Sequence, residues 1–146
     1  MPQSLANRLS TVVETSLPNL RAVAEPDQGA DGDWTPKQEL GHLIDSASNN
    51  HMRFVRAALD GHYHGPTYAQ EPWVNLHGYA DMPWTELVEF WAAYNRLLVR
   101  LIANIPESAL TGLCTVGDHP PMSLGELIED YMVHMQHHLD SITHLS

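Results

Sequence analysis

The chain has 146 residues, of which 43% are hydrophobic and 17% are charged, and its formal net charge is −11. This length fits one domain, residues 1–146, built around a single core. Because phosphate groups and anionic lipids bind to Lys/Arg surfaces and the chain has only seven such residues, we expect neither nucleic acid nor membrane as a partner.

The distribution of cysteine and apolar residues indicates a cytoplasmic protein. No apolar run approaches the roughly 18 residues that a membrane span requires, and residues 1–6 lack the apolar segment of a signal peptide. The single cysteine, Cys114, excludes an internal disulfide. Ten histidines are unusual for this length and make metal binding the first chemistry to consider.

The first amphipathic helix is predicted over residues 3–24, where apolar residues recur at helical spacing. Pro18 lies inside this segment and predicts a kink or a break, because proline removes a backbone donor and its ring clashes with the preceding turn. Residues 25–33 follow as an acidic loop rich in turn-forming residues.

The second helix has strong start and stop signals. Thr35 is the predicted N-cap, Pro36 takes the first helical position, and Gln38 completes a capping box with Thr35. The helix should run to about Asp60 and end at Gly61, because glycine readily adopts the left-handed conformation that ends many helices.

A connection without regular structure is predicted over residues 61–82. Connections of this length are uncommon and often functional. Fully extended, it could reach more than about 60 Å, which exceeds the length of a 25-residue helix. The helices that it joins can therefore be parallel to each other.

The third and fourth helices complete the chain. Apolar periodicity predicts the third over residues 83–104, and residues 105–122 form a second long loop. Ser123 and Glu126 make a capping box, from which the fourth helix runs to about His144. Four amphipathic helices without a convincing strand pattern predict an all-α four-helix bundle.

A pair of histidines in the last predicted helix is the strongest functional signal. His134 and His138 stand four residues apart, which is about 6 Å of rise and about 40° of rotation on a helix, so both rings leave the same face. Two neutral imidazoles at that spacing can bind one metal ion. The surrounding face is apolar, so the two rings need polar partners there.

The third ligand is inferred from levels in the bundle. His42 lies about 9 Å after the start of its helix, and the midpoint of the later pair lies about 13–14 Å before the end of the fourth helix. If the two helices are antiparallel, these levels agree within one turn. Three imidazoles around one ion leave one tetrahedral position open, as catalytic zinc sites do.

The other seven histidines are assigned elsewhere. His51 points about 180° away from His42 on the same helix, His137 points away from its two neighbours towards solvent, and His144 is expected to be exposed. Four more lie in predicted loops, where one of them could line the mouth of the site: His62, His64, His77 and His119.

Two other metal sites are rejected on spacing. Glu39 and His42 match the Glu-x-x-His half-motif of di-iron bundles, but that centre needs a second half-motif. The positions three residues before the two later histidines are Tyr131 and Met135, which cannot supply it. The His-Glu-x-x-His helix of zinc proteases is also absent.

Three segments of the sequence closely resemble the DinB/YfiT-like superfamily of metal-dependent enzymes. They are Trp34 to His51 (WTPKQELGHLIDSASNNH), Tyr68 to Val74 (YAQEPWV) and Asp130 to His138 (DYMVHMQHH). The resemblance covers nearly the whole chain in the same order. It implies a four-helix bundle with up-down-down-up connectivity and a long crossover between the second and third helices.

The resemblance also implies a site. By motif, the family's metal ligands correspond to His42, His134 and His138. Some relatives are thiol S-transferases or thiol-dependent isomerases that use low-molecular-weight thiols, and many others are described as hydrolases. Dimers occur in the family, so a homodimer is an expectation here.

Two functions follow from these residues. In the first, a divalent ion, Zn²⁺ or Ni²⁺, activates a water or a low-molecular-weight thiol against an unknown small-molecule substrate, as a hydrolase or thiol S-transferase. Asp45 and Asn49, one and two turns after His42, would assist catalysis, and Tyr68 or Trp73 would cover the site. In the second, the bundle is non-catalytic and binds a metal or a small ligand.

Overall fold

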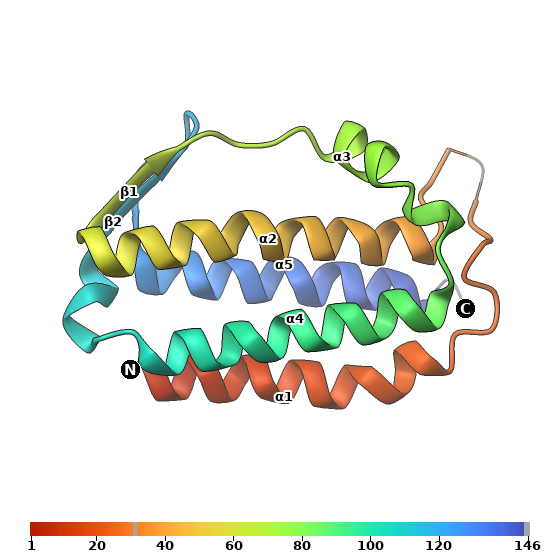
Figure 1. The fold of residues 1–146 in the computed structure, drawn as a ribbon, viewed down its shortest axis with the longest axis horizontal. Helices are drawn as coiled ribbons and strands as arrows, with labels where there is room; N and C mark the ends of the chain where they lie inside the picture. Colours follow the sequence, from red (N-terminus) through yellow and green to blue (C-terminus); the bar gives the residue numbers. More distant parts are fainter. Residues whose placement is uncertain (31, 145–146) are drawn as a thin grey trace.

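The computed structural model describes residues 1–30 and 32–144, so Asp31 of the predicted acidic loop and residues 145–146 lie outside the described residues. Four long helices form a bundle, which confirms the predicted fold class (Figure 1). They are α1 (Pro2–Arg21), α2 (Pro36–Asp60), α4 (Trp84–Asn104) and α5 (Leu124–His144). No helix among the described residues is long and apolar enough to cross a membrane.

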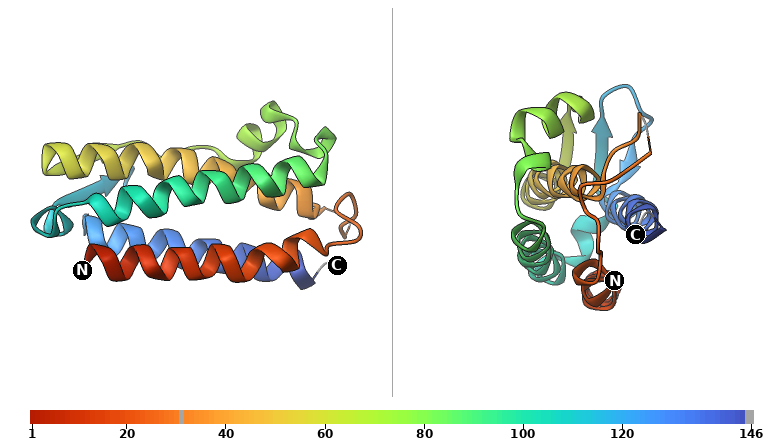
Figure 2. Two further views of the ribbon diagram at one scale, coloured as in Figure 1. Left: turned by 60° about the horizontal axis from the view of Figure 1, so that its bottom comes forward. Right: turned by 90° about the vertical axis from the view of Figure 1, so that its right-hand side faces the viewer.

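The directions of the helices place α2 beside an antiparallel α5. In Figure 1, α1 and α5 run one way, whereas α2 and α4 run the other. Each helix packs on two neighbours, because α1 and α2 both contact α4 and α5 (Figure 2). The core between them is made of fully buried apolar side chains from all four helices, including Leu9, Leu43, Phe54, Trp91, Leu98 and Ile128.

The first helix is continuous through Pro18, so of the two predicted outcomes there, a kink or a break, the break is wrong. Pro18 lies in the last turn of α1, where it deprives the helix of only one hydrogen bond. The Pro18 carbonyl still accepts a hydrogen bond from the backbone N–H of Ala22 at 3.1 Å. Leu17 and Leu20 are buried on either side of it, and this packing holds the turn in place.

Both predicted capping boxes are present. In α2, Gln38 N–H donates to Thr35 Oγ1 at 3.3 Å and Thr35 N–H donates to Gln38 Oε1 at 2.9 Å. In α5, Glu126 N–H donates to Ser123 Oγ at 3.1 Å and Ser123 N–H donates to Glu126 Oε1 at 2.9 Å. Gly61 ends α2 with a φ of +83°, a conformation that favours glycine.

The two long connections are not structureless, which corrects the prediction for both. The first contains β1 (His62–Gly65), α3 (Gln70–His77) and a 3₁₀ turn at Tyr79–Asp81. The second contains a 3₁₀ turn at Glu107–Thr111, β2 (Leu113–Val116) and β3 (Met122–Ser123). Strands of two to four residues are too short to show a period-two pattern, so the sequence carries no visible signal for them.

A small three-stranded sheet ties the two connections together. β1 pairs in parallel with β2, with His62 opposite Leu113, and β2 pairs antiparallel with β3. Figure 1 shows this sheet at one end of α2, while α3 lies near the other end. The connection from α2 to α4 therefore lies along the outside of α2 and walls one side of the site.

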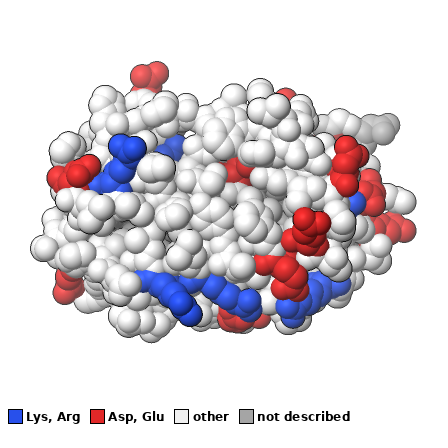
Figure 3. Space-filling model, viewed as in Figure 1, with Lys and Arg blue, Asp and Glu red and all other residues white. Residues whose placement is uncertain are grey.

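Charged side chains on the opposite edge of the bundle pair with one another. Figure 3 shows basic and acidic groups side by side along the edge where α4 and α1 run. Arg21 of α1 bonds to Glu89 of α4 at 2.8 Å, and Arg96 of α4 bonds to Glu14 of α1 at 2.9 Å. These pairs join the two helices, and because they are exposed to solvent each contributes little to stability.

Candidate metal centre

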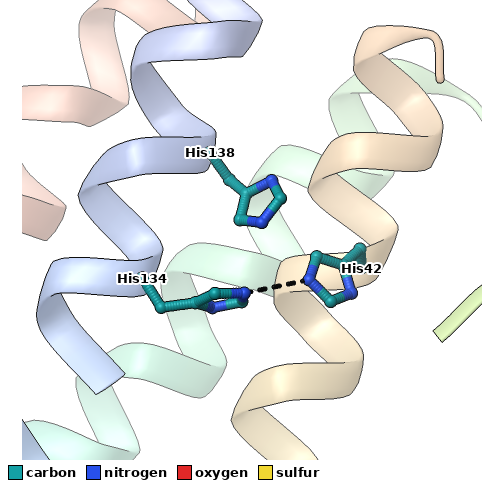
Figure 4. Close-up of side chains that lie close together, drawn as sticks. All are labelled: His42, His134 and His138. Atoms are coloured by element: carbon teal, nitrogen blue, oxygen red, sulfur yellow. Dashed lines mark hydrogen bonds between the residues drawn. The ribbon is translucent and has the colours of Figure 1, made fainter. Parts of the chain in front are cut away.

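Three histidines from two helices converge at one point between α2 and α5. His42 comes from the second turn of α2, and His134 and His138 come from successive turns of α5 (Figure 4). The Nε2 atoms of His42 and His134 are 3.2 Å apart, and one ring nitrogen of each of the three histidines lies within 4.8 Å of the others. The antiparallel packing of α2 and α5 thus brings together the three residues that the sequence singled out.

Burial keeps the imidazoles of His42 and His134 neutral. His42 is completely buried, and burial, with the adjacent His138 and His134, lowers its pKa to about 3. Burial and His138 also lower the pKa of His134. A neutral imidazole has a lone pair for a metal, so no proton must be displaced from His42 before it binds one.

The distances fit a shared ion. Two nitrogen ligands at about 2.0–2.1 Å from a tetrahedral Zn²⁺ stand about 3.3 Å apart, close to the separation observed between the two Nε2 atoms. His42 Nδ1 is buried and has no hydrogen-bond partner among the described residues. Such a group costs about 1–3 kcal/mol, and retention of one beside two other imidazoles is typical of a functional site.

Glu39 holds the third imidazole in position, a role that the sequence reasoning missed. His138 Nδ1–H donates to Glu39 Oε1 at 3.1 Å, with Oε2 at 3.3 Å, and both side chains are largely buried. This bond places the proton on Nδ1 and leaves Nε2 with its lone pair. Its position was the available signal, because Glu39 lies one turn before His42 and therefore near the same level of the bundle.

Asp45 lies on a different side of α2 and fastens the crossover. Tyr79 Oη–H donates to Asp45 Oδ1 at 2.7 Å, and His77 Nδ1 lies 2.9 Å from the same oxygen. Burial raises the pKa of Asp45, although the bonds from Tyr79 and His77 oppose the rise. Gly41 permits this contact, because a Cβ there would lie 2.1 Å from the Tyr79 ring.

Asn49 is half-buried and bonds to its own helix. Its Nδ2 group donates to the backbone carbonyl of Asp45 at 2.9 Å. The structure therefore places Asp45 and Asn49 near each other, whereas the two residues that follow them in the sequence, Ser46 and Asn50, line the pocket described next. Consecutive residues of a helix are 100° apart, so a residue next to a pocket-lining position points towards a different face of the helix.

A pocket of about 340 Å³ opens beside His134. This volume suits a small organic molecule. The walls come from α2, α5 and both connections. Polar lining residues are Ser46, Asn50, Arg53, Thr67, Gln70, His119 and Asp130, and apolar or aromatic ones include Tyr68, Cys114, Val116, Met122, Leu127 and Tyr131.

Aromatic residues of the crossover cover the triad. The ring of Tyr68 lies 6.5 Å from the ring of His42 and 5.2 Å from that of Trp73. Trp34, just before α2, lies 5.1 Å from His42. Burial raises the pKa of Tyr68 to about 12, so its hydroxyl stays protonated and can donate a hydrogen bond at neutral pH.

The remaining histidines lie outside the triad. His51 Nδ1 bonds to Tyr94 Oη at 2.9 Å, and His119 lines the pocket. His77, now at the end of α3, bonds to Asp45. The side chains of His62, His64, His137 and His144 are exposed.

We expect the chelator-treated protein to lose stability as the pH falls from 7 to 5. His42 and His134 resist protonation in the folded state, whereas the unfolded chain takes up these protons near pH 6.5. The unfolded state therefore binds more protons below that pH, at up to about 1.4 kcal/mol per histidine per pH unit. Denaturant unfolding at the two pH values measures the loss. A His42→Leu variant should show a shallower dependence, and an unchanged slope would contradict the assignment.

Comparison with known proteins agrees with the fold. The DinB superfamily model matches residues 6–142. A protein of Oceanobacillus iheyensis named "putative metal-dependent hydrolase" is 25% identical over 114 residues, which are 78% of this chain and 66%, just under two thirds, of that protein.

A solved structure has the same fold. It is YfiT from Bacillus subtilis, described as "a probable metal-dependent hydrolase with an unusual four-helix bundle topology". The match has a TM-score of 0.83 and 21% sequence identity, and it covers 97% of this chain and 85% of that one. With the family model spanning nearly all of the bundle, the chain belongs to the DinB superfamily.

Proposed function

We propose that this protein is a metal-dependent hydrolase whose His42, His134 and His138 hold one divalent ion. The observation that supports the proposal most directly is the convergence of three imidazoles beside a pocket large enough for a substrate. Imidazole ligands suit Zn²⁺ and Ni²⁺. When bound, such an ion supplies Lewis acidity that lowers the pKa of a water or thiol sharing the site.

The residues of the chain prepare this site. Glu39 orients His138 through the bond to Nδ1, and the buried wall of α2 keeps His42 neutral. Tyr68 covers the triad and offers a hydroxyl donor to a substrate in the pocket. We place Asp45 in a positioning role, because its carboxylate joins α2 to Tyr79 and His77, and we place Asn49 beside it as support for the same turn.

The coordination number favours an enzyme over a purely structural site. Among the described residues, the group that could hold a metal has three members, and the side of His134 opens to the pocket. Structural zinc sites have four protein ligands, whereas catalytic sites keep a position for water or substrate. The names given to the relative and to the solved structure support hydrolysis as the reaction.

The test begins with metal analysis of the purified protein, followed by a Co²⁺-substituted form. We expect about one divalent ion per chain and a visible spectrum that changes when a small molecule enters the open position. The loaded protein is then assayed on ester and amide substrates, and separately on thiols paired with electrophiles. Hydrolysis supports the proposal, thiol-dependent turnover would reassign the reaction to S-transfer, and absence of metal would overturn it.

Replacing Glu39 by Gln is expected to weaken metal affinity by about 10- to 100-fold. Removal of the carboxylate charge weakens the bond that orients the His138 ring and makes it a stronger donor. Competition with a chromophoric chelator measures the change. Glu86→Gln, an exposed carboxylate in the first turn of α4, is the matched control and should leave the affinity as it is. Equal affinities for the two variants would refute this role.

A further inference from the structure

One cation in the pocket wall has no partner of opposite charge within the described part of the chain. Arg53 of α2 is only 8% exposed and lines the pocket that also contains His134. Its guanidinium donates to the carbonyl of Pro66 at 3.2 Å and approaches Asn50 Oδ1 at 3.5 Å. Both acceptors are neutral, and the guanidinium has five N–H donors, so several remain for another group.

Arg53 differs in this respect from the other buried cation among the described residues. Lys37, the other buried cation, forms an ion pair with Asp27 at 2.8 Å. Among the described residues, no carboxylate lies within 4.0 Å of the Arg53 guanidinium, although the chain has 18 acidic residues. A buried charge without a counter-charge is destabilising, so its presence in a pocket wall indicates that a ligand supplies the counter-charge.

The positions of the charged side chains along the pocket indicate where the anionic group of a ligand would bind. Arg53 follows His42 by eleven residues, about 16 Å along α2. The side chain of a helical residue leans towards the N-terminus, so the guanidinium lies nearer to the triad than this distance. Asp130, one turn before His134 on α5, is the acidic residue of the pocket lining and opposes an anion placed beside it. The anionic end of a ligand therefore belongs at Arg53.

The walls between these ends are partly apolar. Val116, Met122 and Leu127 line the pocket together with the buried thiol of Cys114. Ser46 and Asn50 add hydrogen-bonding groups on the α2 side. This composition matches a molecule with a short apolar body and a single charged head.

We propose that Arg53 is an anion-binding subsite that selects substrates carrying a carboxylate or phosphate group at the end remote from the triad. The guanidinium fork forms paired hydrogen bonds with either group. The reacting end of such a molecule, shorter than about 16 Å, then reaches the three histidines. This assignment of substrate class rests on the proposed function for the reacting end, whereas the anion site itself does not depend on it.

The experiment compares three probes of similar shape on the purified protein. They are 4-phenylbutyrate, its neutral amide 4-phenylbutanamide, and phenethyl phosphate, with binding measured by calorimetry and metal content determined in the same samples. We expect at least one of the two anions to bind 10-fold or more tightly than the amide, and their order identifies the preferred head group. Equal binding of all three probes would overturn the proposal.

Variants locate the preference. Arg53→Gln should abolish the difference between anion and amide, Arg53→Lys should retain part of it, and Arg56→Gln, which removes an exposed arginine of the same helix, should preserve it. An anion preference that persists in Arg53→Gln places the anion elsewhere, for example on the metal, and overturns the subsite.

A measurement on the wild-type protein covers the case in which Arg53→Gln does not fold. The Nε–H signal of Arg53 in a ¹⁵N NMR spectrum should shift with the preferred anion and not with the amide, and a signal unaffected by both would refute the subsite. Failure of the metal proposal would appear separately, as protein without metal that still distinguishes anion from amide.

Discussion

Replacing His42 by Ala is expected to reduce metal affinity by roughly 100- to 1,000-fold. Structural zinc sites with four ligands have apparent binding free energies of about 10–16 kcal/mol, or about 2.5–4 kcal/mol per ligand, and 1.4 kcal/mol corresponds to a factor of ten. His42 is the only one of the three imidazoles contributed by α2, so its loss also removes the link between the two helices. Competition titration with a chromophoric chelator measures the affinity.

Matched controls are available on the same helices. His137→Ala removes an exposed histidine that stands between the two α5 ligands, and His51→Ala removes a histidine of α2 that bonds to Tyr94. Both variants should keep the wild-type affinity. If His42→Ala bound metal as tightly as His137→Ala, the ion would lie elsewhere and the three-histidine site would be refuted.

Removal of the metal is expected to lower the melting temperature by about 8–16 °C. A ligand present at about 1,000 times its dissociation constant stabilises the folded state by about 4 kcal/mol. For a chain of about 150 residues, each kcal/mol corresponds to about 2–4 °C. The physical cause is that the ion binds α2 and α5 together in the folded state, whereas the unfolded chain offers no assembled site.

Thermal unfolding with and without a chelator measures this difference. In His134→Ala/His138→Ala, the chelator should have no effect, because the α5 half of the site is absent. The exposed His137→Ala variant should retain the full difference. A wild-type melting temperature that does not respond to chelator or to added Zn²⁺ would show that the triad contributes no metal-linked stability.

Local signals in the sequence were sufficient for the bundle. Hydrogen bonds within a few residues fix the caps of the helices, so the residue types alone specify them. This holds for the N-cap of α2 at Thr35, its C-cap at Gly61 and the capping box of α5 at Ser123. The pairing of β1 with β2 joins residues about 50 positions apart, and neither four-residue segment contains a pattern that predicts pairing with the other. Pro18 allowed either a kink or a break by its residue type, and the helix does not break there because buried neighbours hold that turn.

The residues of the candidate site also fall into two groups, those that the sequence predicted and those that only the packing of the helices revealed. The sequence predicted the three histidines His42, His134 and His138. Their spacing on a helix, and their distances from the helix ends at a fixed rise per residue, can both be calculated from residue numbers alone. The rotation of α2 about its axis decides which of its side chains face His138 and the pocket. It therefore decides the roles of Glu39 and Arg53, and it places Ser46 and Asn50 in the pocket wall in place of the residues that precede them. That rotation is set by packing against α4, α5 and the crossover.

The sequence by itself determined four amphipathic helices, their caps and the spacing of three histidines, because each of these depends on interactions between residues close along the chain. Tertiary structure alone decided that Glu39 supports His138, that Arg53 lines the pocket with no counter-charge among the described residues, and that Asp45 bonds to the crossover. These facts depend on where a side chain of one helix ends relative to another element. Such positions arise from the packing of the whole bundle. Turning a helix by the 100° that separates consecutive residues would replace each side chain's partner with another.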